Sequence, residues 1–244
     1  MEVHAHTHTA RKKWTHYLWE FLMLFLAVFC GFLAEYQLEH KIEKDKEVQF
    51  IHSMIEDLGQ DTAGFEQNKI ELNESIQRAD TLMRLFSSPD IKNYGSDVYY
   101  QGRRITRVVQ VIIHDRTMQQ LKNSGSFRLI RNEKSSSEII NYYSQLGFLE
   151  RLEKIESEEM YEYRKMAVGI FHPILFDNTI NADNGIVRPA GNPALVTYDS
   201  KLLLNFGVSL HYIKITRTAL RRALSEMNIE ARKLIALLQK EYHF

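Results

Sequence analysis

Cysteine is almost absent from this chain of 244 residues, and so is any excess of charge of one sign. Its one cysteine, Cys30, lies in an apolar run, so the rest of the chain can form no disulfide bond and has no thiol nucleophile. The 31 basic and 31 acidic residues balance. A nucleic-acid-binding surface would show a clustered excess of Lys and Arg, so we expect no nucleic acid as a partner.

The motifs of common enzyme and cofactor sites are also missing. The sequence has no glycine-rich phosphate loop, no paired-cysteine metal motif and no Gly-x-Ser-x-Gly elbow. Two weak candidates for a metal site are a histidine-rich tail and the adjacent pair His114 and Asp115, which resembles part of a metal phosphohydrolase site. The tail has His4, His6, His8 and His16, and the pair could recruit His52, Asp57, His172 and His211. The spacing of the second set follows no ligand pattern, so we expect no catalytic residue, no cofactor and no metal.

Fourteen apolar residues in a row, Phe21 to Ala34, form the longest hydrophobic run. At about 1.5 Å per residue they span roughly 21 Å, less than the roughly 30 Å hydrocarbon core of a bilayer. We therefore predict a transmembrane helix that begins upstream at Trp14 and covers residues 14–36. Three basic residues precede it and acidic residues follow it, which predicts a cytoplasmic tail, residues 1–13, and an exported domain, residues 37–244. A signal peptide cleaved after Ala34 is the alternative, although Phe32 stands where a small residue is needed.

Glu20 is the one acidic residue between Trp14 and Ala34. It can reach the interface or be neutralised by His16 or Lys13, because a carboxylate near the membrane surface costs far less than a central one. It also begins a helical stripe of mostly small residues, which could let a second helix approach closely. The stripe that we predict as a transmembrane interface consists of Glu20, Leu24, Ala27, Gly31 and Ala34.

Two apolar seams with alternating three- and four-residue spacing predict long helices over residues 48–86 and 203–241. Their main positions are Ile55, Leu58, Phe65, Leu72, Ile76, Leu210, Ile213, Leu220, Leu224 and Leu234. We expect an all-α fold in which a single transmembrane helix continues into an elongated helical bundle with long N- and C-terminal helices. The two seams either pair directly and antiparallel or pack separately on the middle helices.

The middle of the chain gives weaker signals. Residues 88–103 and 172–199 are expected to be irregular loops, and the second contains three of the four prolines. Residues 105–113 fit a strand or a helix equally well. A short helix over residues 115–122 would begin at Asp115 as its N-cap. Ser135 with Glu138 predicts a capping box that opens a helix ending near residue 171, and Gly125 predicts a left-handed cap.

The segment TMQQLKNSGSFRLIRNEKSSSEIINYY, residues 117–143, resembles a pattern in uncharacterised single-pass inner-membrane proteins of Gram-negative bacteria. The matching positions are Thr117, Leu121, Ser124, Gly125, Leu129, Ile130, Asn132, Ile140, Tyr142 and Tyr143. The opening of the chain, with basic residues before an apolar run that ends in Gly-Phe-Leu-Ala-Glu, is similar too. The resemblance implies an N-terminal anchor in the bacterial inner membrane, a periplasmic helical domain and no assigned activity.

These observations favour a non-enzymatic envelope protein. We expect a membrane-anchored helical scaffold or interaction subunit that contacts lipid and either a protein partner or a second copy of itself. The alternative is an extracytoplasmic sensory or ligand-binding module that signals through a partner, which rests on fold analogy. An enzyme with a site at His114, Asp115 and the 172–199 loop is the third interpretation. Tyr142, Tyr143, Tyr161 and Tyr163 fit core or interface positions better than a catalytic pocket.

Overall fold

A computed structural model describes residues 14–244, and the His-rich tail at residues 4–8 and the basic residues 11–13 lie outside the described part. The described chain is all-helical, as expected, with one isolated bridge between Ile180 and Ile186. Its elements are α1 (Trp14–Phe86), η1 (Ile91–Asn93), α2 (Gly95–Arg104), α3 (Arg116–Asn123), η2 (Ser126–Leu129), α4 (Glu133–Ala167), α5 (Pro173–Asp177) and α6 (Ser200–Tyr242). They form two compact units that divide between Phe50 and Ile51.

The first unit contains the apolar part of α1. Every residue from Trp14 to Glu39 is exposed, including the whole apolar window that is long enough to cross a membrane. Such a continuous exposed apolar surface is unstable in water. The predicted transmembrane helix is therefore present as a helix that could span a bilayer.

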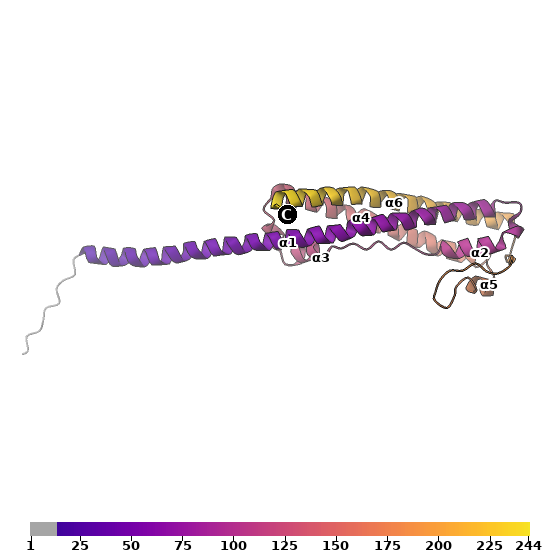
Figure 1. The fold of residues 1–244 in the computed structure, drawn as a ribbon, viewed down its shortest axis with the longest axis horizontal. Coiled ribbons are helices and arrows are strands. Elements are labelled where there is room, and N and C mark those ends of the chain that lie inside the picture. Colours follow the sequence, from indigo (N-terminus) through magenta and orange to yellow (C-terminus); the bar gives the residue numbers. More distant parts are fainter. Residues whose placement is uncertain (1–13) are drawn as a thin grey trace, which may run out of the picture. The chain divides into compact units, whose positions relative to one another are not determined.

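The second unit is a bundle of residues 51–86 of α1 with α4 and α6 (Figure 1). Along α1 and α6 the contacts run in opposite directions, so these helices are antiparallel. From one end to the other the contacting pairs are Phe86 with Phe206, Asp80 with Lys214, Asn73 with Arg221, Thr62 with Asn228, and His52 with Phe244. Of the two arrangements that the sequence left open, the structure thus has the direct antiparallel pairing, and α4 also packs along α6.

The core of the bundle consists largely of the predicted seam residues. Of the main seam positions, Ile55 is half-buried and all the others are buried. Gly59 and Gly64 do not interrupt α1, because a helix whose apolar face is packed can accommodate the roughly 1 kcal/mol cost of each glycine. The helix ends at Phe86, where the predicted helix over residues 48–86 also ends.

The prediction of an irregular loop over residues 88–103 was wrong, because η1 and α2 occupy most of it. Ser96 and Asp97, two of the polar residues that suggested a loop, lie in the first turn of α2, while Val98 and Tyr99 are buried on its inner face. Gly95 is needed there, since a Cβ at this position would lie 1.9 Å from the carbonyl oxygen of Pro193. Residues 172–199 are mainly irregular, as predicted, apart from the short α5.

The start of α4 also differs from the prediction. Asn132, not Ser135, is the N-cap, and its Oδ1 accepts a hydrogen bond from the backbone N–H of Ser135 at 2.9 Å. The capping box of Ser135 and Glu138 is therefore absent, because the helix begins three residues earlier than expected. Gly125 does have the left-handed conformation that we predicted, with φ of 67° after the end of α3.

Candidate functional site

Residues 105–115, here called the strap, begin with a turn at Ile105 and Thr106 and continue without regular secondary structure, so they form neither the strand nor the helix that the sequence allowed. The antiparallel contacts place α1 and α4 parallel to each other, so the chain must return along the bundle between them. At about 3.3 Å per residue, the nine residues after the turn, 107–115, cover roughly 30 Å of that return. A helix of the same length would cover only about 14 Å, which explains why the segment is not helical.

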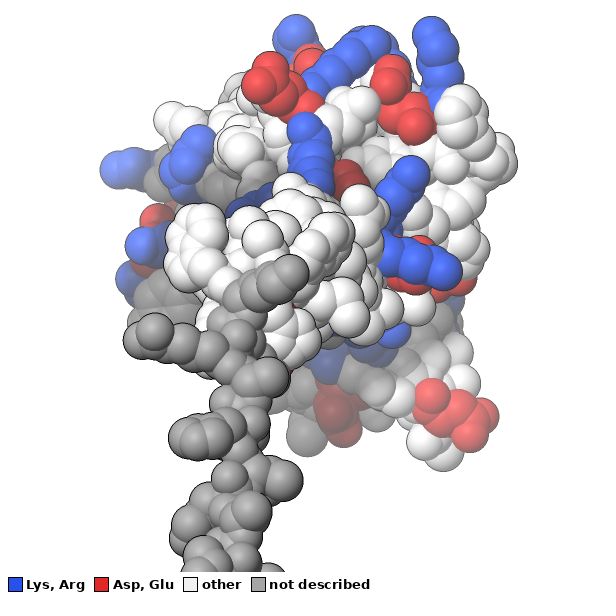
Figure 2. Space-filling view, turned by 90° about the vertical axis from the view of Figure 1, so that its left-hand side faces the viewer, with Lys and Arg blue, Asp and Glu red and all other residues white. Residues whose placement is uncertain are grey.

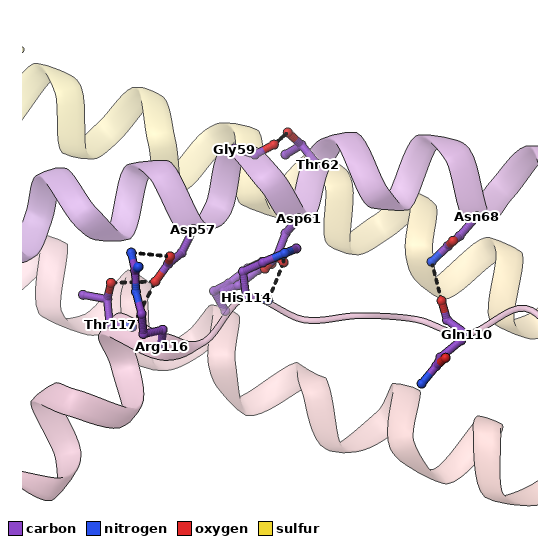
Figure 3. A network of polar contacts seen from close by, with 10 residues as sticks. Asp57, Gly59, Asp61, Thr62, Asn68, Gln110, His114, Arg116 and Thr117 are labelled. Carbon is purple, nitrogen blue, oxygen red and sulfur yellow. Dashed lines mark hydrogen bonds and ion pairs between the residues drawn. The ribbon is translucent and has the colours of Figure 1, made fainter.

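The backbone of the strap is held by side chains of the helices, because no strand lies beside it. Asn68 of α1 donates to the carbonyl oxygen of Gln110 at 3.4 Å, and the N–H of Val111 donates to Glu153 of α4 at 3.3 Å. The N–H of His114 donates to Asp61 at 2.7 Å (Figure 3). These side chains therefore provide the hydrogen bonds that a neighbouring strand would otherwise give to the backbone of the strap.

Asp61 is the centre of the polar cluster at the end of the strap. Its side chain is fully buried, and Oδ1 accepts from both the backbone N–H and the imidazole Nδ1 of His114, the latter at 2.9 Å. Oδ2 accepts from the hydroxyl of Tyr142 at 3.1 Å. Burial raises the pKa of Asp61, and these hydrogen bonds oppose that rise because they stabilise the carboxylate.

Asp57 binds the start of α3 in the same way. Its Oδ2 accepts from the backbone N–H of Thr117 at 2.9 Å and from the Thr117 hydroxyl at 2.6 Å. Its Oδ1 lies 3.2 Å from a guanidinium nitrogen of Arg116 (Figure 3). Asp57 thus accepts from a backbone N–H in the first turn of α3, which is the role that was expected of the Asp115 side chain. Asp115 occupies the N-cap position, but its carboxylate accepts from Gln119 instead.

The cluster contains a hydrogen-bonded His–Asp pair, and both hydroxyl groups that contact its aspartates among the described residues are held in hydrogen bonds. The Thr117 hydroxyl is engaged by Asp57, and burial raises the pKa of Tyr142 well above its usual range, so that this phenol stays protonated and donates to Asp61. The geometry supports a structural clasp that holds the strap and α3 against α1.

The suggested metal ligands of the His114 and Asp115 pair are not brought together. His114 pairs with Asp61, His52 lies 3.4 Å from Glu56, and the N–H of His172 donates to the Tyr99 hydroxyl. Within residues 14–244 no three His, Cys, Asp or Glu side chains are grouped so that they could hold a metal ion. Of the four tyrosines, Tyr142, Tyr143 and Tyr163 are buried in the bundle and Tyr161 is exposed.

A second polar cluster lies inside the bundle, around Arg217 of α6. Arg217 and Glu156 of α4 are both fully buried, and Nε of Arg217 lies 2.6 Å from Oε1 of Glu156. The same guanidinium donates to the Ile105 carbonyl oxygen of the strap at 3.1 Å and to the hydroxyl of Ser75. Arg217 therefore joins α1, α4, α6 and the strap at one point.

One residue in the sequence pointed to this cluster, although the apolar periodicity by itself did not explain it. Arg217 occupies one of the two positions in the 203–241 seam that are not apolar. A charged residue at a seam position needs a buried counter-charge, and Glu156 supplies it. The aspartates that hold α3 and the strap gave no such signal, because Asp57 and Asp61 lie beside the seam positions and not at them.

The predicted transmembrane stripe lies on the exposed part of α1. Glu20 contacts His16 at 3.2 Å, as one of the two interpretations of this residue expected, and Leu24, Ala27, Gly31 and Ala34 are all exposed. Phe21, Phe25 and Phe29 stack in a row, with ring centroids 6.2 and 6.0 Å apart. At 100° per residue this aromatic row lies on the side of the helix away from the stripe.

Comparisons with protein-family models, with curated protein sequences and with solved structures gave no match to this chain.

Proposed function

We propose that this protein is a membrane-anchored helical scaffold, or interaction subunit, of the bacterial envelope. One observation supports the proposal above the others. The helix that carries the fully exposed apolar window, α1, also supplies the first core helix of the bundle from Ile51 onward. An apolar helix of this length is stable when lipid or another membrane helix covers it.

The basic residues before the window favour a cytoplasmic N-terminus, which would place the bundle in the periplasm. A pair of reporter fusions after Phe244 tests this orientation, one with alkaline phosphatase and one with a fluorescent protein that matures in the cytoplasm. We expect activity from the phosphatase fusion and little fluorescence. The reverse pattern, or a mature protein that begins after Ala34, would overturn the proposal.

Protein contacts are proposed to use the stripe that contains Ala27 and Gly31. Small residues let helix backbones approach closely, while the bulky Phe21, Phe25 and Phe29 row suits contact with lipid chains. A photo-crosslinking residue placed at Ala27 is expected to capture a protein, identified by mass spectrometry from native membranes. The same residue at Phe29 is the matched control. Equal capture from both positions, or from neither, would argue against this interface.

A further inference from the structure

A pocket of about 610 Å³ opens in the bundle beside α2, α4 and α5. Three arginines line it: Arg103 near the end of α2, Arg107 in the strap and Arg164 near the end of α4. Its volume falls in the range of about 300–1,000 Å³ that is usual for small-molecule sites. It lies at the opposite end of the bundle from the Asp57 and Asp61 cluster, so it is a separate feature.

The positive charge of the pocket is not balanced by its own lining. No Asp or Glu is among the described residues that line it, and Arg103, Arg107 and Arg164 form no ion pair within residues 14–244. Other arginines near this end of the bundle are paired. Arg104 lies 3.7 Å from Glu74, and Arg188 contacts Asp97. Unpaired guanidinium groups around one cavity are typical of a site for an anion.

Two of the arginines are already held in place. The guanidinium of Arg103 lies 4.9 Å from the centroid of the Phe176 ring, and Arg107 donates to the backbone oxygen of Asn184 at 2.8 Å. A stacked guanidinium keeps the N–H groups at its edge available, and each guanidinium has five donors. Most of these donors are therefore free to bind an anion without a large ordering cost.

The rest of the pocket wall is apolar. The Phe171 and Phe176 rings stack with centroids 4.8 Å apart, and Ile180 and Val168 add aliphatic surface. Tyr163 contributes its ring rather than its hydroxyl, because the hydroxyl donates to the Gly102 carbonyl oxygen at 2.7 Å. A bare inorganic anion would leave this surface in water, so the pocket suits a ligand that has an apolar body as well as a charge.

We infer that this pocket binds a small organic anion, with its carboxylate or phosphate group between Arg103, Arg107 and Arg164 and its apolar body on Phe171 and Phe176. The inference goes beyond the scaffold function and does not depend on it, because every residue that it uses lies within the bundle. The same chemistry could come from a soluble metabolite or from the head of an anionic lipid.

Fluorine NMR of a trifluoromethyl-biphenyl carboxylate, titrated with the full chain in zwitterionic nanodiscs, tests the inference. Empty nanodiscs give the baseline, and the matching neutral carboxamide is the control ligand. We expect the carboxylate to bind at least about tenfold more tightly than the carboxamide. Equal affinity of the two ligands, binding of inorganic phosphate as tight as that of the carboxylate, or no binding of either would overturn the inference.

Three variants locate the bound anion. Arg103→Gln and Arg164→Gln are each expected to weaken carboxylate binding by about tenfold, with little effect on the carboxamide. Arg151→Gln is the matched control, because Arg151 also stacks on a phenylalanine, Phe148, but lies outside the pocket. An equal loss in Arg151→Gln, or none in the two pocket variants, would show that the anion binds elsewhere.

A further arm of the experiment separates the two sources of the ligand. Nanodiscs that contain an anionic phospholipid will suppress carboxylate binding if the site takes a lipid head group, and will leave it unchanged if the site takes a soluble anion. Either result agrees with an anion site, and each assigns a different source.

Discussion

Replacement of Arg217 by methionine is expected to be among the most destabilising single changes in the bundle. The side chains of Arg217 and Glu156 are both 0% exposed, and 2.6 Å separates Nε from Oε1. Methionine fills much of the same volume but leaves the Glu156 carboxylate in the core without a positive charge. The second oxygen of that carboxylate, Oε2, already has no hydrogen-bond partner among the described residues.

The expected size of the effect follows from this burial. Breaking a buried ion pair by removing one partner costs about 3–5 kcal/mol, whereas an exposed pair contributes about 0–1 kcal/mol. In a domain of this size, each kcal/mol lowers the melting temperature by about 2–4 °C. Arg217→Met should therefore lower the melting temperature by roughly 6–20 °C. Lys233→Met, which removes an exposed pair with Glu230, should change it by no more than a few degrees.

Thermal unfolding of the full chain in nanodiscs, followed by circular dichroism, measures both variants. The double variant Arg217→Met with Glu156→Leu separates the ion pair from the other contacts of Arg217. Replacing both charges by apolar groups removes the unpaired carboxylate, so the double variant should be more stable than Arg217→Met alone. If Arg217→Met behaves like Lys233→Met, the Arg217–Glu156 pair is not desolvated in the folded bundle. If the double variant is no better than the single one, the loss comes from the Ser75 and Ile105 contacts instead.

Three further predictions use the same unfolding assay. Burial raises the pKa of Asp61 above its ordinary value of 3.8, so the folded protein binds the proton of this carboxyl group more tightly than the unfolded chain does. The resulting contribution to the free energy of unfolding is fully present below pH 3.8 and is lost as the pH rises through the folded-state pKa. Asp61→Asn removes this titration, so the stability of the parent relative to this variant should fall as pH rises from about 3.5 to 7. Gly125→Val should cost about 1–3 kcal/mol, because the residue has a positive φ, although no neighbouring atom would obstruct the side chain. Gly95→Ala should destabilise the protein because its Cβ would meet the Pro193 carbonyl, whereas Gly207→Ala, in open space within α6, should stabilise it by about 0.5–1 kcal/mol.

Each of these predictions has a result that would contradict it. A parent-to-variant difference that is constant with pH would show that Asp61 does not titrate differently in the folded state. An unchanged melting temperature for Gly125→Val would reject the left-handed cap. Equal effects of Gly95→Ala and Gly207→Ala would mean that α2 does not approach residue 193 as closely as described.

The long helices were predictable from sequence because one physical rule specifies them. Apolar residues such as Leu58 and Leu220 recur at helical spacing, and burying that face requires a partner helix, so both α1 and α6 were predicted. The spacing did not say which helix each of them packs against, so their direct pairing stayed open until the fold was known. The apolar window was equally clear from its length and its lack of charge. Gly125 was identified because few residues other than glycine adopt a positive φ readily.

The segments between the long helices depend on contacts that sequence spacing does not encode. Residues 95–104 form a helix because Val98 and Tyr99 reach a core contributed by distant parts of the chain. The strap is extended because Asp61 and Asn68, more than forty residues before its central part, bind its backbone. Arg103 and Arg164 are far apart in the chain, so no motif links them, and the pocket is visible only in the folded bundle.

The strap has a consequence for how the bundle moves. The backbone of its second half is bound by side chains such as Asp61 and Asn68, so rotation of a few side-chain torsions can release residues 110–114 without breaking any helix, whereas Ile105 and Val109 are buried. Such a segment can open alone, at a free energy below that of global unfolding. The carbonyl oxygen of Ile105 accepts a hydrogen bond from the buried Arg217, and Arg107 lines the arginine-lined pocket. Opening that spreads from residues 110–114 to residue 105 would therefore change both the Arg217 cluster and the pocket.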